Sequence, residues 1–264
     1  SEVDSCDEED VRRCIQEIPE DDKSEYMEAL RTSPHIVESE SSALDFLRWA
    51  NYDAKLAAKR LVRYWKERKY LFGEEKAFLP MRLTEALRDD HEMIRSGIVV
   101  LLPDDLNERC VVYLDRNRID YSHTDRFSLV RSIWYFVHVA MEEKNTITNG
   151  IVTIGNFKTE TSNTYNRKLS KLMWTSVNEC FPIKICSLHA CHPPFVAAIL
   201  FPVLKAVMGR HVRLRFIMHT GTNACIMDRL ETYGLEKHGV PESLGGTHSC
   251  EVHDWFDDRL RRGL

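Results

Sequence analysis

The sequence predicts an α/β fold with a mostly parallel β-sheet floor flanked by helices, preceded by a small all-helical N-terminal unit. Three observations support this prediction. Short, apolar, β-branched runs alternate with helix-length stretches from residue 98 onward. Apolar residues recur at helical spacings of three and four through residues 24–72. A run of fourteen residues, 195–208, is uncharged and non-polar except for Lys205, and it lies between the last two predicted strands.

Composition is that of an ordinary globular protein with a sizeable core. The chain has 264 residues, of which 43% are hydrophobic and 29% charged, and its net charge of -5 gives no general attraction to nucleic acid. Eight scattered cysteines are typical of reduced thiols in the cytosol. No run reaches transmembrane length, and the acidic start is unlike a signal peptide. We therefore expect a cytoplasmic protein.

We expect four segments along the chain. We predict that residues 1–23 form an acidic mobile arm, because residues 1–25 carry eleven acidic and three basic side chains. Residues 24–80 form the helical N-terminal unit, residues 81–250 form the α/β domain, and residues 251–264 form a C-terminal helix or tail.

The helical unit has recognisable start signals. Serines at 41 and 42 precede the apolar residues Leu44 and Leu47, and Asp53 can cap a second helix. That helix continues into a basic run, residues 60–69, which holds five basic side chains against Glu67 alone. The run is either a solvated face or a patch for membrane headgroups.

The α/β domain is predicted from its alternation of elements. The predicted strands are Ile98–Leu102, Cys110–Leu114, Gly150–Ile154, Lys184–Leu188 and Leu214–Met218. The predicted helices are 121–144, 163–180 and 224–233. Strands separated by helices imply right-handed crossovers and a mostly parallel sheet.

The apolar run 195–208 is the most unusual stretch of the chain. Fourteen residues are too few to span a bilayer, which takes about 20. Strong helix formers dominate it, Pro202 would kink the helix, and Gly209 would cap its end. Such a helix is either a buried core helix or a helix with one face on the protein and the other toward a hydrophobic ligand or membrane.

Motifs for catalysis and metal binding are absent from the sequence or incomplete in it. The chain has no dinucleotide or nucleotide loop, no zinc-protease motif and no nucleophile elbow. Cys110 and Arg116 match the bare spacing of a thiol phosphatase, but the residues between them are a predicted strand. Cys186, His189, Cys191 and His192 are dense enough to suggest zinc, although strand alternation puts Cys186 and His189 on opposite faces. We therefore expect neither catalytic nor metal residues, and a binding protein instead of an enzyme.

Five segments, in order, resemble the CRAL-TRIO lipid-binding family. Residues 43–60 (ALDFLRWANYDAKLAAKR) resemble its helical leader, and residues 110–118 (CVVYLDRNR) resemble its first core strand. Residues 181–195 (FPIKICSLHACHPPF) resemble its "YP-x-(K/R)" segment, and residues 213–221 (RLRFIMHTG) its last strand. Residues 240–246 (VPESLGG) resemble its closing motif.

The resemblance implies a helical leader, a pocket floored by the sheet, and residues 195–208 as a movable gate. It implies non-enzymatic binding and intermembrane transfer of one hydrophobic ligand, such as a phospholipid or another small lipid, by a monomer without other cofactors. The predicted ligand-binding residues lie on the strands, on one helix and in the gate: Met173, Ile185, Ser187, His189, Phe195, Ala198, Ile199, Pro202, Val203, Val207, Ile217 and His219.

In a member of this family, basic residues beside the gate contact membrane phosphoinositides. Here Arg60, Lys184 and Arg215 match that pattern, whereas Ala50 and Cys186 replace arginines. We therefore expect a transient, peripheral association with an anionic membrane. Ile183 and Val212 replace an acidic residue and a threonine of the family's inositol-lipid binders, which argues against recognition of phosphatidylinositol.

Two other hypotheses remain. The chain could be a lipid-sensing or protein-interaction module without transfer activity, with the acidic arm as a partner-binding tail. It could also be a phosphatase that uses Cys110 and Arg116.

Overall fold

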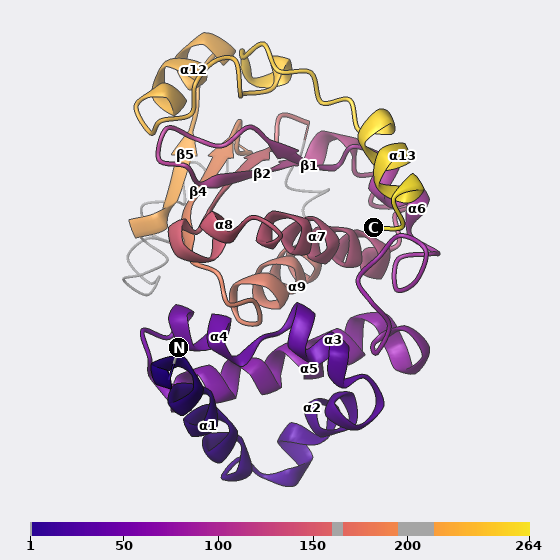
Figure 1. Ribbon diagram of the computed structural model, residues 1–264. Helices are drawn as coiled ribbons and strands as arrows, with labels where there is room; N and C mark the ends of the chain where they lie inside the picture. Colours follow the sequence, from indigo (N-terminus) through magenta and orange to yellow (C-terminus); the bar gives the residue numbers. More distant parts are fainter. Residues whose placement is uncertain (1, 160–165, 195–213) are drawn as a thin grey trace.

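The computed structural model describes residues 2–159, 166–194 and 214–264. Figure 1 shows two layers of organisation: a helical unit formed by the first part of the chain, and an α/β domain stacked on it. The helices of the first unit are α1 (Glu2–Gln16), α2 (Glu20–Thr32), α3 (Pro34–Glu40), α4 (Ala43–Trp49) and α5 (Ala54–Lys76). This arrangement confirms the predicted fold class.

The α/β domain contains a five-stranded sheet in the order β1-β2-β3-β4-β5. The strands are β1 (Val99–Leu102), β2 (Cys110–Asp115), β3 (Ile151–Asn156), β4 (Ile185–Cys191) and β5 (Phe216–His219). Only β1 runs antiparallel to its neighbour, so the sheet is mostly parallel. Each predicted strand is found, with ends that differ by at most three residues.

Helices cover both faces of this sheet. α7 (Arg126–Met141) and α9 (Arg167–Asn178) lie on one face, and α12 (Asn223–Glu231) lies on the other (Figure 1). The remaining short elements are α6 (His91–Arg95), α8 (Lys144–Asn149), α13 (His253–Arg261) and the 3-10 turns Arg116–Arg118 and Glu242–Leu244. The helix expected over 121–144 is found as α7, and the short helix α8 follows it after a turn at residues 142–143.

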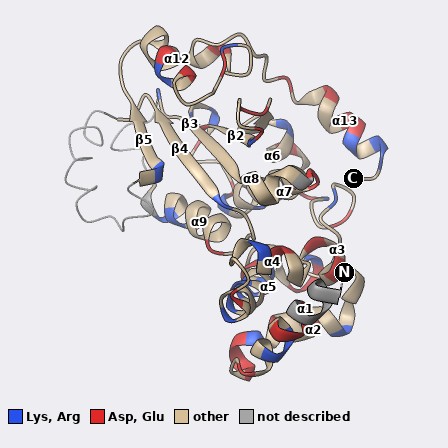
Figure 2. Cartoon of the chain, turned by 60° about the vertical axis from the view of Figure 1, so that its left-hand side comes forward, with Lys and Arg blue, Asp and Glu red and all other residues tan. Residues whose placement is uncertain are grey.

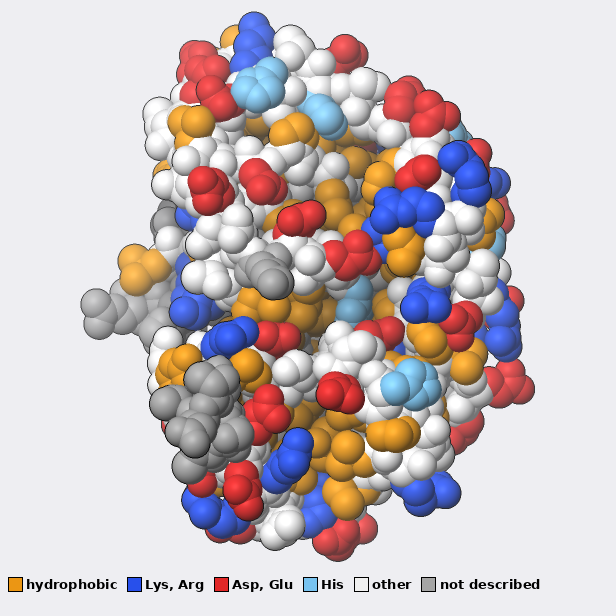
Figure 3. Space-filling view, viewed as in Figure 1, with side chains coloured by type: hydrophobic (Ala, Val, Ile, Leu, Met, Phe, Trp, Pro, Cys, Tyr) orange, Lys and Arg blue, Asp and Glu red, His pale blue; other side chains and the backbone are white. Residues whose placement is uncertain are grey.

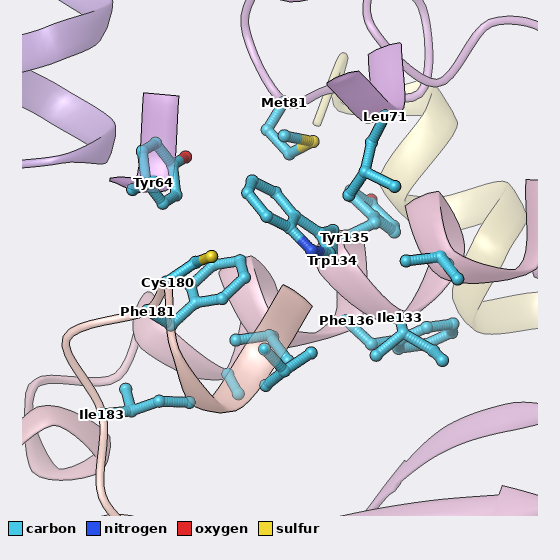
Figure 4. Close-up of a cluster of buried hydrophobic side chains, with 14 of the residues drawn as sticks. Tyr64, Leu71, Met81, Ile133, Trp134, Tyr135, Phe136, Cys180, Phe181 and Ile183 are labelled. Atoms are coloured by element: carbon cyan, nitrogen blue, oxygen red, sulfur yellow. The ribbon is translucent and has the colours of Figure 1, made fainter. Parts of the chain in front are cut away.

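The helical unit is joined to the domain by a continuous aromatic core. Figure 4 shows Tyr64 of α5 beside Trp134 of α7 and Phe181 from the connection before β4. Ring centroids of Tyr64 and Trp134 are 5.1 Å apart, and those of Trp134 and Phe181 are 4.7 Å apart. Stacked and edge-on aromatic pairs of this kind fix the orientation of one layer against the other.

A buried polar network reinforces the same junction. Arg68 is fully buried and donates to Glu40 (2.7 Å), to the hydroxyl of Tyr64 (3.0 Å) and to the Leu79 carbonyl (2.6 Å). The Tyr64 hydroxyl also bonds His138 of α7, at 2.8 Å. Losing either partner of a buried ion pair is strongly destabilising, so this network holds the unit in one position.

The first helix differs from the expected mobile arm. α1 packs against α4 and α5, and its Val11 and Ile15 are buried in the main core. These two residues are four apart and therefore share one helix face. The charge excess of this segment concealed an amphipathic helix.

Candidate functional site

The candidate site is the sheet face on the side of α7 and α9. The strand register places Leu101, Val112, Thr153, Leu188 and Phe216 in one row across this face. Val112 and Leu101 pack in the core with α7 and α9, which fixes the face of the whole row. A second row on the same face contains Leu114, Gly155, Ala190 and Met218.

This face is not uniformly buried. Val112 is 5% exposed, whereas Thr153, Leu188 and Phe216 in the same row are half-buried, as is Met218 in the second row. The half-buried residues of this face from β2 to β5, which we call the floor, are Leu114, Thr153, Phe157, Leu188, Phe216 and Met218. Mostly apolar side chains left half-covered on a sheet face are typical of a hydrophobic binding surface.

Gly155 shapes one end of the floor. A methyl group at this position would lie 2.7 Å from the ring of Phe157, so the absence of a side chain lets that ring lie across the sheet. The guanidinium of Arg116 lies 5.0 Å from the Phe157 ring, and it also donates to the hydroxyls of Tyr121 (2.7 Å) and Ser170 (3.3 Å). The floor therefore ends at the buried Arg116 and its two half-buried hydroxyl partners.

The opposite face, under α12, holds a buried group of polar side chains on β4 and β5. Nδ1 of His189 lies 2.8 Å from Nε2 of His219, and Nε2 of His189 lies 2.9 Å from the Ser187 hydroxyl. The two histidine rings stack, and Tyr233 packs edge-on against both. Burial lowers the pKa of His189 to about 3 and that of His219 to about 4, so both are neutral near pH 7.

A β-bulge explains why the predicted ligand residues divide between these faces. The register between β3 and β4 shifts after Ile151 and Ile185, so Val152 pairs with Ser187. Ile185 and Met173 lie with α9 in the main core, whereas Ser187, His189, Ile217 and His219 lie on the α12 face. The expectation that Cys186 and His189 lie on opposite faces is wrong, because Cys186 also packs on the α12 side after the bulge.

The other predicted ligand residues belong to the gate. Phe195, Ala198, Ile199, Pro202, Val203 and Val207 lie outside the described residues. Their roles stay predictions.

Arg60, predicted to contact the membrane, is engaged within the protein. Its Nε donates to the Phe181 carbonyl at 2.7 Å, its other guanidinium nitrogen donates to the Asn178 carbonyl, and its guanidinium stacks on Trp49 at 3.7 Å. These bonds tie α5 to the connection between α9 and β4. Lys184 and Arg215 are half-buried and directly precede the parallel strands β4 and β5, so they lie toward the same end of the sheet.

The rest of the basic run is also paired internally. Arg63 pairs with Glu179, Lys66 with Asp22 (3.2 Å), Arg68 with Glu40, and Lys69 with Glu28 (2.8 Å) and Glu74. This run therefore connects the helices of the N-terminal unit to one another and to the domain. Figure 3 likewise shows acidic and basic side chains interspersed over one face of the molecule.

The phosphatase hypothesis conflicts with the environment of Cys110. Cys110 is buried in β2, and burial raises the pKa of its thiol to about 12. The nucleophile of that chemistry is a thiolate, which such a cysteine does not supply near neutral pH. Within residues 2–159, 166–194 and 214–264, no three side chains of the metal-binding types come together as a site.

None of the six floor residues was predicted from the sequence: Leu114, Thr153, Phe157, Leu188, Phe216 and Met218. Alternation from Ile185 selected the odd-numbered residues of β4, and the bulge moved these to the other face. A surface hollow of about 460 Å³ lies elsewhere, between Leu106, Glu231 and Glu236, and its rim is largely charged. The described part of the chain has no helix long and apolar enough to cross a bilayer.

Comparison with known proteins identifies the family. The model of the CRAL/TRIO domain matches residues 94–246, more than half of the chain. This chain belongs to the CRAL/TRIO domain family. Membership supports a lipid-binding or lipid-transfer role in general, and members of the family are generally not enzymes.

The curated relatives are more distant. Alpha-tocopherol transfer protein-like proteins of Homo sapiens and Mus musculus are each 25% identical over 214 and 208 residues, which cover 77% of this chain. This chain spans 57% of their length, so it matches a little over half of each relative. The crystal structure of Sfh5 superposes with a TM-score of 0.50 at 11% identity and covers 96% of both chains, which supports the fold.

Proposed function

We propose that this protein holds one hydrophobic molecule against the floor and transfers it between membranes, with residues 195–208 as the gate. The half-buried apolar floor beside α9 is the observation that supports this proposal most directly. Removing a lipid chain from water releases about 0.8 kcal/mol per methylene, so an eighteen-carbon chain gains on the order of 10 kcal/mol at such a surface. The chain order also fits, since residues 195–208 connect β4 to β5, the two strands that supply Leu188, Phe216 and Met218.

The class of ligand follows from what surrounds the floor. Ile183 is buried in the apolar core, where the family's inositol-lipid binders place an acidic residue. We therefore propose a cargo that is recognised through its apolar body and not through an inositol headgroup. The name of the curated relatives refers to transfer of α-tocopherol, which makes this lipid a suitable first probe.

The first experiment identifies the cargo and tests its transfer. Native mass spectrometry of the protein purified from its own cells should show one bound lipid per chain. Movement of that labelled lipid from donor to acceptor vesicles should then depend on the protein. Bound lipid without movement would favour the lipid-sensing module over the carrier.

Matched leucine variants locate the cargo. Leu188→Asn on the floor should lower cargo affinity by about tenfold or more, because a polar amide then meets the apolar ligand. Leu106→Asn is the control, since Leu106 is 66% exposed in the β1–β2 loop, away from the floor. Equal affinity in the two variants would show that the floor does not bind the cargo.

The gate has a separate test. Val203→Asp should reduce both cargo retention and uptake from vesicles, with secondary structure kept, because a charge opposes contact with lipid in either state. Unchanged retention would return residues 195–208 to the hypothesis of an ordinary core helix.

A further inference from the structure

The loop between α4 and α5 has an unusual backbone. Asn51 and Tyr52 are consecutive non-glycine residues with positive φ, at 52° and 65°. Together they end α4, and the Tyr52 N–H donates to the Leu47 carbonyl at 2.8 Å. Asparagine tolerates this conformation, but for a bulky residue such as tyrosine it is strained, and glycine is the residue that it favours. A large aromatic side chain is therefore held at the turn against the local conformational preference.

The side chains at this turn point outward. Tyr52 is 58% exposed and Leu56, one helical turn further along α5, is 44% exposed. Lys55 and Lys59 are exposed on the same stretch of helix, and neither has a carboxylate partner among the described side chains. We call Tyr52, Lys55, Leu56 and Lys59 the tip.

Nearby acidic groups are already engaged. The Asp53 side chain accepts the Leu56 N–H at 3.0 Å as the cap of α5, and Asp45 pairs with Arg48 at 3.6 Å. The tip thus combines two exposed apolar side chains with two lysines. An apolar wedge flanked by basic residues is complementary to an anionic lipid surface, where Tyr and Leu enter the interface and Lys meets the headgroups.

The tip also lies toward the end of the sheet where the parallel strands begin. Two turns of α5 separate Leu56 of the tip from Arg63. Arg60, between them, donates to the carbonyls of Asn178 and Phe181 in the connection from α9 to β4. α4 contacts α8, which leads into β3, so the helices that carry the tip lie at the end of the sheet where β3 begins. Figure 2 shows basic residues of α5, α9 and the starts of β4 and β5 toward this side.

We propose that the tip is the element of the helical unit that inserts into anionic phospholipid membranes when the protein docks. This inference rests on the proposed carrier function. The strained turn presents the tyrosine ring to the lipid interface, while the basic run of residues 60–69 serves internal pairing.

The test separates insertion from folding. Tyr52→Gly removes the aromatic ring and relieves the positive-φ strain, so Tm should stay equal or rise by about 2–4 °C. Binding to anionic vesicles, made of phosphatidylcholine with roughly 30% phosphatidylserine, should nevertheless fall. The double variant Tyr52→Ser/Leu56→Ser should bind about tenfold more weakly in a flotation assay.

The control variant is Tyr70→Ser/Leu106→Ser, which removes the same two residue types from sites that are 60% and 66% exposed but distant from the tip. It should bind vesicles like the unaltered protein. Lys55→Gln/Lys59→Gln should lose about tenfold or more on anionic vesicles and little on pure phosphatidylcholine.

Cargo binding, measured by native mass spectrometry in the same variants, keeps this inference distinct from the carrier function. Normal cargo with weakened vesicle binding in the tip variants supports the inference. Vesicle binding equal to that of the control overturns it and leaves the carrier function standing. A protein that carries no lipid and binds no vesicles contradicts both.

Discussion

The two faces of the sheet use the same strands in different ways. Under α12, Ile154 is fully buried and Ser187, His189 and His219 form a buried hydrogen-bonded chain. On the α7 and α9 side, the neighbouring residues Thr153, Leu188 and Phe216 are half-buried, and most of this floor is apolar. A face whose side chains are fully packed stabilises one structure, whereas a half-covered apolar face keeps surface for a ligand.

Replacing one aliphatic residue by asparagine on each face should separate these roles. Ile154→Asn places an amide in a sealed core and should lower the free energy of unfolding by about 4 kcal/mol. Leu188→Asn should cost about 1–2 kcal/mol, because its side chain already meets partial exposure. Urea unfolding of both variants measures the difference, and equal losses would contradict the division between a structural and a binding face.

Acid should lower the stability of the protein mainly through the histidines on the α12 face. Because the pKa of His189 (about 3) and of His219 (about 4) lies below the unfolded value near 6.5, the unfolded chain binds these protons first. Stability is therefore full above about pH 6.5 and falls as the pH drops toward 4, by about 1.4 kcal/mol per pH unit for each neutral histidine.

In His189→Asn, the free energy of unfolding should depend less steeply on pH between about 6.5 and 5, because about one proton fewer is bound on unfolding. Urea unfolding at several pH values measures this slope. His138, whose pKa burial lowers to about 4 at the junction with the helical unit, supplies a further and separate proton. A variant with the same slope as the unaltered protein would show that the histidine pair is not the acid-sensitive group.

Two basic residues near the start of β4, Arg60 and Lys184, allow a further comparison. Arg60→Gln should lower the free energy of unfolding by about 2 kcal/mol, because two carbonyls lose a charged donor. Lys184→Gln should leave stability within about 0.5 kcal/mol and weaken binding to anionic vesicles about fivefold. The opposite outcome, with Arg60 affecting vesicles alone, would return that residue to the predicted membrane contact.

The fold was predictable because it depends on local pattern. Asp53 accepts the Leu56 N–H as the expected cap, and each β-branched run became a strand. The site was less predictable because it depends on register. One bulge near Ile185 moved Ser187 and His189 to the α12 face, and alternation alone gives no sign of it.

The role of the basic run was hidden for a related reason. The partners of Arg60 and Arg63 lie more than a hundred residues away along the chain, in the connection after α9. Only the packing of the helical unit on the domain brings them together. A charge run in a sequence therefore predicts exposure or pairing equally well until the tertiary structure is known.

The smallest expected effect tests the shape of the floor itself. In Gly155→Ala, the new methyl group would meet the ring of Phe157 at 2.7 Å, and the half-buried ring can turn away at a cost of about 1 kcal/mol. Because the ring forms one end of the floor, its displacement should change cargo affinity about threefold, measured by titration with the lipid identified above. Phe157→Leu gives the matched control, since it keeps an apolar side chain that tolerates the methyl group, and combining it with Gly155→Ala should remove most of the effect. If Gly155→Ala alone leaves affinity unchanged while lowering stability, Phe157 packs in the domain core and takes no part in ligand binding.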